Sequence, residues 1–146
     1  MKWSRMGREM RTGGKAAQYF SYGPWEFNIH KAGLLASDSR KYQPQVCRPS
    51  PEWVGPFIDI DQAHVERGDL SKPLIFATVV KDGQAFPLLI DGHHRAVKAL
   101  NQQKTVRTIT LDLADSLKVL KAPEHFVQEM IRDGRMLGLL PAESPH

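Results

Sequence analysis

The chain contains a single cysteine, Cys47, and no apolar run approaching the roughly 20 residues needed to cross a bilayer. One cysteine cannot form an internal disulfide and offers no paired metal-ligand spacing, which excludes disulfide-stapled and zinc-finger proteins. Residues 1–8 lack the apolar stretch of a secretory signal. We therefore expect a cytoplasmic protein with no membrane partner.

Two widespread site motifs are also missing. Gly13-Gly14-Lys15 resembles the end of a Walker loop, but the first glycine of that pattern would fall on Glu9, and Ala16 follows the lysine. No Gly-x-Ser-x-Gly elbow occurs, although a Ser-His-Asp triad stays open. The histidines outside residues 93–94 are scattered without partners, so no zinc site is predicted.

Acidic residues are scarce in the N-terminal third. Residues 1–50 hold nine Lys/Arg and three Asp/Glu, a net charge of +6, whereas residues 51–146 have a net charge of −2. This asymmetry is typical of a segment that contacts a polyanion, although a solvated basic arm would look the same. We expect salt-dependent contacts with the DNA backbone from five basic residues, namely Arg8, Arg11, Lys15, Arg40 and Lys41.

The length of 146 residues fits one domain with additions. Residues 1–56 form a basic, aromatic and proline-containing extension, residues 57–122 the core, and residues 123–146 a C-terminal helix and tail. The aromatic side chains between Tyr19 and Phe27 allow two interpretations, stacking on bases or filling the edge of a small core.

The hydrophobic pattern predicts an α+β fold, a small mixed sheet with packed helices. Asp61 is a candidate N-cap, Asp82-Gly83 a hairpin turn, and Gly134 a residue that weakens or ends the last helix. The predicted strands are 57–60, 74–80, 86–90 and 108–113, and the predicted helices are 62–67, 93–103 and 123–136.

Residues 91–98 follow an apolar strand and begin a helix. A helix start carries N–H groups without intrahelical acceptors and the positive end of the peptide dipole, so cations added there favour a phosphate. Gly92 lets the backbone approach the ligand, and Arg95 and Lys98 hold phosphate oxygens. Lys72 would help from the neighbouring strand start.

The predicted catalytic residues are His93, His94 and Arg95. His93 is assigned acid–base work, because an unperturbed histidine has a pKa near ~6.5. His94 shares a helix face with Lys98 and lines the phosphate cradle, and Arg95 also stabilises developing charge. Asp91 either holds a Mg²⁺ ion that accompanies a nucleotide or caps the helix.

Two stretches, Gly68 to Phe76 and Ile90 to Ala99, resemble the ParB/sulfiredoxin superfamily over roughly residues 57–115. In that superfamily a strand precedes a Gly-x-[His/Arg]-Arg helix start that holds nucleotide phosphates. His94 and Arg95 match the His-Arg pair of sulfiredoxin, whereas His93 stands in place of its catalytic cysteine, so sulfinic acid reduction is not expected. The chain after residue 115 is too short for the helix-turn-helix and dimerisation domains of ParB.

The resemblance implies a stand-alone member, similar to ParB-like nuclease domains and to small plasmid-borne proteins that hydrolyse nucleotides, cleave DNA and interfere with conjugation. It implies binding of ATP or another nucleoside triphosphate at 91–98, with Mg²⁺, hydrolysis and DNA cleavage. One alternative is a non-catalytic nucleotide-sensing or inhibitory module that blocks a protein partner. Another makes residues 1–56 a partner-binding surface and leaves 91–98 structural, with Arg95 tied to a carboxylate. No oligomeric state is predicted.

Overall fold

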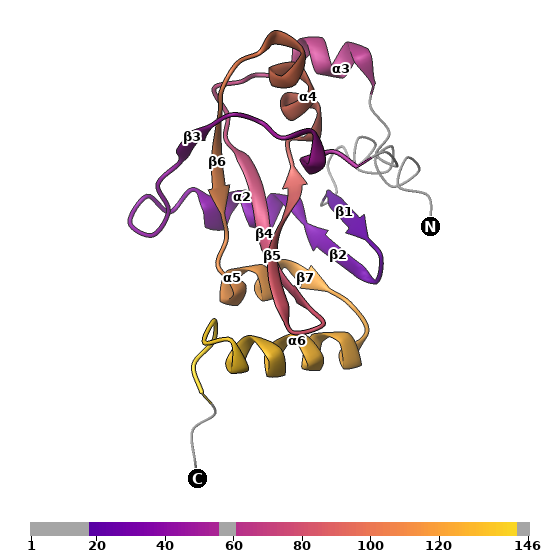
Figure 1. The fold of residues 1–146 in the computed structure, drawn as a ribbon, viewed down its shortest axis with the longest axis vertical. Helices are drawn as coiled ribbons and strands as arrows, with labels where there is room; N and C mark the ends of the chain where they lie inside the picture. Colours follow the sequence, from indigo (N-terminus) through magenta and orange to yellow (C-terminus); the bar gives the residue numbers. More distant parts are fainter. Residues whose placement is uncertain (1–17, 56–60, 143–146) are drawn as a thin grey trace.

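Two small sheets form the framework of the computed structural model, which describes residues 18–55 and 61–142 (Figure 1). One sheet has the order β1-β2-β7, with strands Tyr19–Tyr22, Trp25–Asn28 and Leu120–Lys121. The other has the order β3-β6-β4-β5, with strands Gln45–Cys47, Val106–Thr110, Leu74–Lys81 and Gln84–Asp91. Because β4 runs parallel to β6 and antiparallel to β5, the larger sheet is mixed, as predicted. The second sheet was not predicted.

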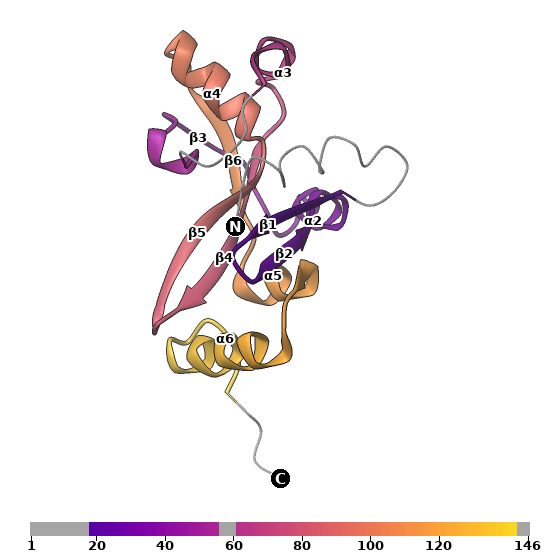
Figure 2. The same ribbon diagram turned by 90° about the vertical axis from the view of Figure 1, so that its right-hand side faces the viewer.

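Five α-helices and one 3-10 turn lie around these sheets in the described part of the chain (Figure 2). They are α2 (Ile29–Ala36), η1 (Pro51–Trp53), α3 (Gln62–Arg67), α4 (His93–Gln102), α5 (Leu113–Val119) and α6 (Glu124–Met136). The predicted α+β class is confirmed. Among the described helices, none has both the length and the apolar content required to cross a membrane.

The predictions that rest on a capping residue or a turn sequence are confirmed at two places. The side chain of Asp61 caps α3, where its Oδ1 accepts a hydrogen bond from the Ala63 N–H at 2.9 Å. Asp82 and Gly83, with φ of 53° and 73°, form the tight turn between β4 and β5. The predicted strand 57–60 lies outside the described residues.

The prediction of a strand over 108–113 was wrong at its end. Strand β6 stops at Thr110, and Asp112 caps α5 by accepting a hydrogen bond from the Asp115 N–H at 2.8 Å. Leu111 and Leu113 are both buried, so the apolar alternation of the strand continues into the helix start. A pattern of period two cannot separate the two elements there.

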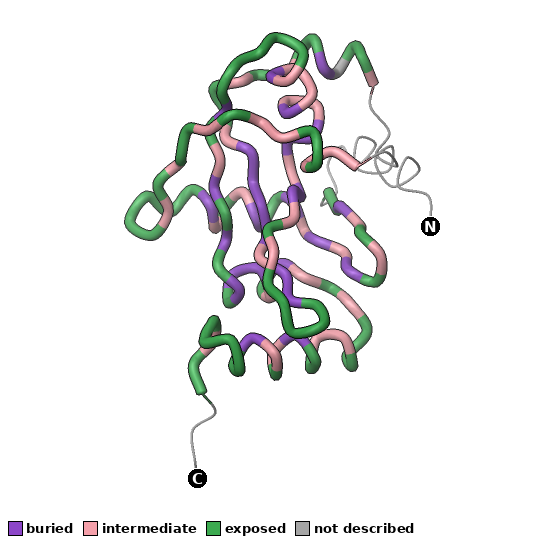
Figure 3. The backbone as a smooth tube through the Cα atoms, viewed as in Figure 1, coloured by how far each residue is buried: buried purple, intermediate pink, exposed green. Residues whose placement is uncertain are grey.

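The main core joins both sheets (Figure 3). Phe20, Trp25 and Phe27 of the β1–β2 hairpin are buried in the same cluster as Ile90 of β5 and Leu111 after β6. These three aromatic side chains therefore fill the core, which is the second of the two interpretations. Among the described residues, the predicted boundary at residue 56 does not separate two cores.

A buried carboxylate ties the segment after α2 to α5. Asp115 is 3% exposed, and its Oδ2 accepts a hydrogen bond from the Tyr42 hydroxyl at 2.6 Å. Lys41 and Lys118 each place Nζ 3.0 Å from one of its oxygens. Burial alone would raise the pKa of Asp115, but the hydrogen bonds from Tyr42, Lys41 and Lys118 outweigh it and lower the pKa to about 2. Burial also raises the pKa of Tyr42 to about 12.

Gly134 lies inside α6, which continues to Met136, so of the two predicted possibilities, weakening or ending the helix, the second is wrong. A Cβ there would overlap the buried side chain of Leu113 and lie 3.2 Å from Leu140 Cδ1. We expect Gly134→Ala to lower the free energy of unfolding by about 1–3 kcal/mol through overpacking. This loss exceeds the gain of about 1 kcal/mol from the helix propensity of alanine.

Gly33→Ala in α2 is the matched control, because a Cβ there would meet no heavy atom of residues 18–55 or 61–142 within 4 Å. This variant should raise the free energy of unfolding by about 0.5–1 kcal/mol. Urea unfolding of both variants measures the contrast. Equal stabilisation by the two alanines would contradict the packing of α6 against Leu113.

Candidate functional site

The predicted phosphate site lies where β5 turns into α4 (Figure 1). Gly92 links the two elements with φ 105° and ψ 21°, a conformation that favours glycine. A Cβ on Gly92 would lie 2.9 Å from Arg95 Nη2 and 3.0 Å from Leu74 Cγ. The absence of a side chain thus permits both the turn and the close packing of Arg95 against it.

No side chain in the first turn of α4 or at its N-cap offsets the positive end of the helix dipole. The helix has no side-chain cap and no acidic residue in its first turn. The other α-helices of the described ranges have one or the other, from Asn28, Asp61, Asp112 and Glu124. The positive end of the α4 dipole is therefore left for another partner.

Arg95 lies across this junction and is mostly covered. Its Nη2 donates to the Pro73 carbonyl at 3.2 Å and lies 3.4 Å from Asp91 Oδ2, and its side chain is 17% exposed. Its Nε is buried without a hydrogen-bond partner among the described residues. The guanidinium does contact a carboxylate, as the structural alternative expects, but at the long limit for such a bond. One donor remains unsatisfied, which costs about 1–3 kcal/mol.

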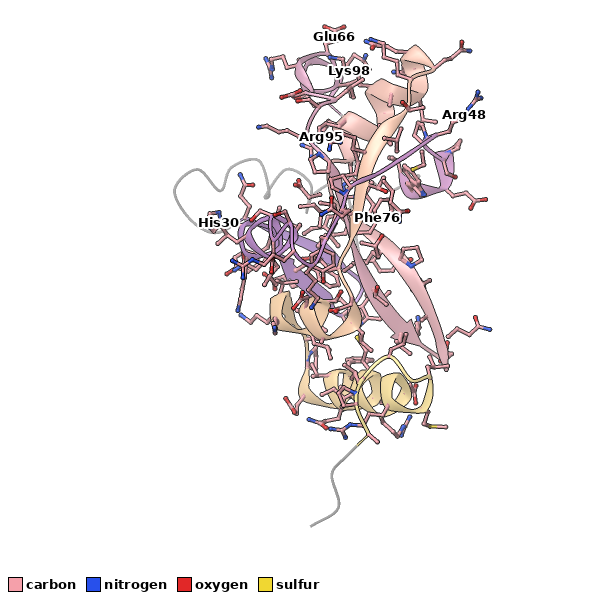
Figure 4. All side chains as sticks on the ribbon, turned by 90° about the vertical axis from the view of Figure 1, so that its left-hand side faces the viewer. His30, Arg48, Glu66, Phe76, Arg95 and Lys98 are labelled. Atoms are coloured by element: carbon pink, nitrogen blue, oxygen red, sulfur yellow. The ribbon has the colours of Figure 1, made fainter. Side chains whose placement is uncertain are left out.

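Lys98 and His94 hold α3 against α4 and do not line an open cradle. Lys98 Nζ donates to the carbonyls of Glu66 at 2.9 Å and Gly68 at 2.8 Å, at the C-terminal end of α3 (Figure 4). His94 Nε2 accepts a hydrogen bond from the Asp61 N–H at 3.2 Å, at the other end of α3. Their predicted roles in phosphate binding and catalysis stay predictions, and the observed contacts of both side chains are with the backbone of α3 and its flanks. The ammonium group of Lys98 stabilises the C-terminal end of α3, because it satisfies carbonyls that have no partner within the helix.

His93 is buried, and the predicted acid–base role does not fit its position. The side chain is 6% exposed, and its ring stacks on Phe20 with centroids 4.7 Å apart. Burial, followed by the charges of His94 and Arg95, lowers the pKa of His93 to about 3 against an opposing hydrogen bond to the Leu89 backbone. His93 is therefore neutral at physiological pH and faces the core.

Asp69 lies in the loop before β4, where its Oδ1 accepts hydrogen bonds from the Ser71 N–H at 2.9 Å and the Ser71 hydroxyl at 2.6 Å. These two bonds, with smaller contributions from the positive charges of Lys72 and Arg95, lower the pKa of Asp69. Lys72 itself is exposed. The run Asp69-Leu70-Ser71 is a turn signal that could have indicated this loop.

Asp91 pairs with Arg95, and the structure brings no further metal ligands to it. The described residues contain no group of three or more His, Cys, Asp or Glu side chains that could hold a metal ion. In this part of the chain the Asp91 carboxylate is a partner of Arg95 at the end of β5.

The residues predicted to contact DNA have different positions. Arg40 is exposed in a turn, and its N–H donates to Asp38 Oδ1 at 3.0 Å. Lys41 Nζ lies 2.9 Å from Asp112 Oδ2 and 3.0 Å from Asp115 Oδ2, and these hydrogen bonds raise the pKa of Lys41 above its ordinary value. Its charge is thus paired with two carboxylates while its side chain stays 44% exposed, and contact with DNA stays a prediction for this residue. The remaining three, Arg8, Arg11 and Lys15, lie outside the described residues.

Comparisons of the chain with protein-family models, with curated proteins and with solved structures gave no match. The functional assignment therefore rests on the chemistry of the β5–α4 junction.

Proposed function

We propose that the protein binds the phosphates of a nucleoside triphosphate, ATP or a relative, at the β5–α4 junction without turning it over. The observation that carries this proposal is the N-terminus of α4, which has neither a side-chain cap nor a first-turn acid and lies beside the buried, unpartnered Nε of Arg95 in the described part of the chain. Helix termini of this kind bind phosphate through backbone N–H groups and the helix dipole.

Arg95 supplies the cation of this site. Its Nε is buried without a partner among the described residues, and its Nη2 lies 3.2 Å from the Pro73 carbonyl, the upper end of the ordinary range, and 3.4 Å from Asp91 Oδ2. A phosphate oxygen would satisfy the guanidinium more strongly than these neighbours do, because charge-assisted bonds to phosphate are short and bidentate. Lys72, exposed at the start of β4, adds a second positive charge at the rim.

The order of the elements supports a ParB/sulfiredoxin-like fold for this site. A buried strand, a hairpin and a second strand lead to the Gly-x-His-Arg sequence at a helix start. That strand-to-helix context is what a phosphate-binding motif of this kind requires.

Binding without turnover is favoured over hydrolysis by the position of His93. ATP hydrolysis and DNA cleavage, which the family resemblance implies, need proton transfer at the reacting centre. A buried histidine with a pKa of about 3, stacked on Phe20, does not provide it. A nucleotide-sensing or inhibitory module is thus the better-supported alternative.

The contacts of Arg95 also suggest how binding would be transmitted. A Cβ on Gly68 would lie 3.3 Å from Arg95 Cγ, so the arginine packs directly on the end of α3. Lys98 holds the same end through the Gly68 carbonyl. A phosphate that repositions Arg95 would therefore change how α3 packs against α4. We expect the position of α3 to change when a nucleotide binds.

Calorimetry with ATP and Mg²⁺ tests the proposal. We expect saturable binding by the full chain, and a loss of about tenfold or more in affinity for Arg95→Ala, equivalent to about 1.4 kcal/mol. Arg95→Lys retains the charge but not the planar fork, and should fall between the two. The matched control is Arg132→Ala, which removes an exposed arginine of α6, at the other end of the molecule from α4 (Figure 1), and should bind like the parent.

Two results would overturn the assignment. Adenosine that binds as tightly as ATP would show that phosphates are not recognised, and unchanged affinity in folded Arg95→Ala would remove Arg95 from the site. Phosphate release that depends on Arg95 would replace the sensing module by a hydrolase.

A further inference from the structure

A hollow lined by residues of the β1–β2 turn, the β4–β5 turn and α6 lies at the opposite end of the β4–β5 hairpin from the β5–α4 junction. Figures 1 and 2 show the position of these elements. The hollow has a volume of about 360 Å³. Ligand pockets of proteins begin at roughly this size, about 300 Å³. Eight residues of β5 separate the two places, so they lie about 26 Å apart at ~3.3 Å per residue.

Aromatic rings form one wall of this hollow. Tyr22 and Trp25 are paired across the β1–β2 turn, and their rings stack with centroids 5.9 Å apart and planes at 20°. Trp25 is held by the core at 4% exposure, whereas Tyr22 is 38% exposed. Phe126 of α6 is half-buried on the opposite side. The core thus anchors Trp25, and Tyr22 and Phe126 carry the ring surface that a ligand can reach.

The rim of the hollow is acidic. Glu129 and Asp133 are four residues apart on α6 and so lie on one helix face, and Asp82 approaches from the β4–β5 turn. Lys81 is the one cationic side chain among the lining residues, which gives the lining a net charge of −2 in a chain of net charge +4. Asp133 is paired with its neighbour Arg132 at 3.2 Å.

We propose that this hollow binds an arginine side chain of a basic partner peptide. Aromatic faces attract cations and stack with the planar guanidinium, while carboxylates accept its fork of N–H donors. Tyr22 and Trp25 would cover the stem and the plane of the group, and Glu129 with Asp133 would receive its donors. The charge of the lining, opposite to that of the whole chain, selects a cation.

The test is an NMR titration of the full chain, observed at the Trp25 indole N–H. The probes are N-acetyl-arginine amide and its neutral isostere, N-acetyl-citrulline amide. We expect saturable binding of the arginine probe with a millimolar Kd, about 4 kcal/mol of binding free energy. The citrulline probe should bind about fivefold more weakly or worse, because it keeps the shape and loses the charge.

Variants separate the contribution of the acidic rim from that of the aromatic wall. The pair Glu129→Gln and Asp133→Asn should weaken arginine binding about fivefold or more, whereas Glu124→Gln, on the same helix outside the hollow, should not change it. Tyr22→Leu should weaken both probes. Thermal melts establish that the variants are folded. The ratio of the affinities of the parent chain for the arginine and citrulline probes tests the proposal without any variant.

Equal affinity for arginine and citrulline amides would overturn the proposal, as would the absence of saturation or the persistence of binding in the folded double carboxamide variant. None of these outcomes depends on the phosphate site, since Arg95 lies at the other end of the hairpin.

Discussion

Gly92→Ala is expected to lower the free energy of unfolding by about 2–6 kcal/mol and to abolish nucleotide binding. A φ of 105° lies outside the regions open to alanine, and such strain costs about 1–3 kcal/mol. The new Cβ would also press on Arg95 Nη2 at 2.9 Å and on fully buried Leu74 at 3.0 Å. Overpacking of this kind costs about 1–3 kcal/mol more. Urea unfolding and calorimetry with ATP measure the two effects.

Gly138→Ala separates strain from contact. Gly138 has φ 75°, but a Cβ there would meet no heavy atom of the described residues within 4 Å. It should cost about 1–2 kcal/mol, the conformational part alone, and leave ATP binding unchanged. Suppose that Gly92→Ala lowered the free energy of unfolding no more than Gly138→Ala does and still bound ATP. The close packing of Arg95 on Gly92 would then be shown to matter neither for stability nor for binding.

Asp115→Asn is expected to lower the free energy of unfolding at neutral pH by about 2 kcal/mol. The variant turns charge-assisted hydrogen bonds from Tyr42, Lys41 and Lys118 into neutral ones at a side chain that is 4% exposed, and bonds to charged groups are worth about 1.5–3 kcal/mol each. The expected total stays near the value of one such bond, because the lysine side chains are 44% and 59% exposed and their pairs with Asp115 are screened by solvent. Chemical denaturation with far-UV circular dichroism measures this loss.

The pH dependence of that loss identifies the carboxylate as its source. The pKa of Asp115 falls from its ordinary 3.8 to about 2 on folding, so its contribution is complete above pH 4 and disappears as the pH falls towards 2. The parent and Asp115→Asn should therefore converge in stability over that interval. The control is Asp82→Asn, in an exposed turn where asparagine also tolerates the positive φ, and its stability should follow that of the parent. A constant difference between pH 7 and pH 2 would contradict the role assigned to Asp115.

The parts of the fold that the sequence predicted correctly depend on local signals. Strand β4 is a continuous apolar run, Asp82-Gly83 adopts the positive φ values of a tight turn, and Asp61 caps α3 within its own turn. Helix α5 was missed because its start, Asp112, interrupts an apolar alternation that continues from β6. The smaller sheet was missed because β7 is two residues long and pairs with β2 across more than ninety positions.

At the site, too, contacts between residues close in sequence were predicted and contacts between distant residues were missed. Gly92 and Arg95 are three residues apart, and one helix turn brings them together as expected. The partners of His94 and Lys98 are backbone atoms of α3 about thirty residues away, which no side-chain pattern reveals. His93 was misjudged because the ring that buries it, Phe20, belongs to a segment interpreted as an extension.

The most direct test of the proposed phosphate site is the NMR signal of Arg95 Nε–H during titration with ATP. This donor is buried and unpartnered among the described residues, so a phosphate oxygen should shift its resonance strongly downfield, together with the backbone amides of residues 92–95. Adenosine should leave these signals in place. An unmoved Arg95 Nε–H in the presence of saturating ATP, with shifts confined to other parts of the chain, would contradict the assignment.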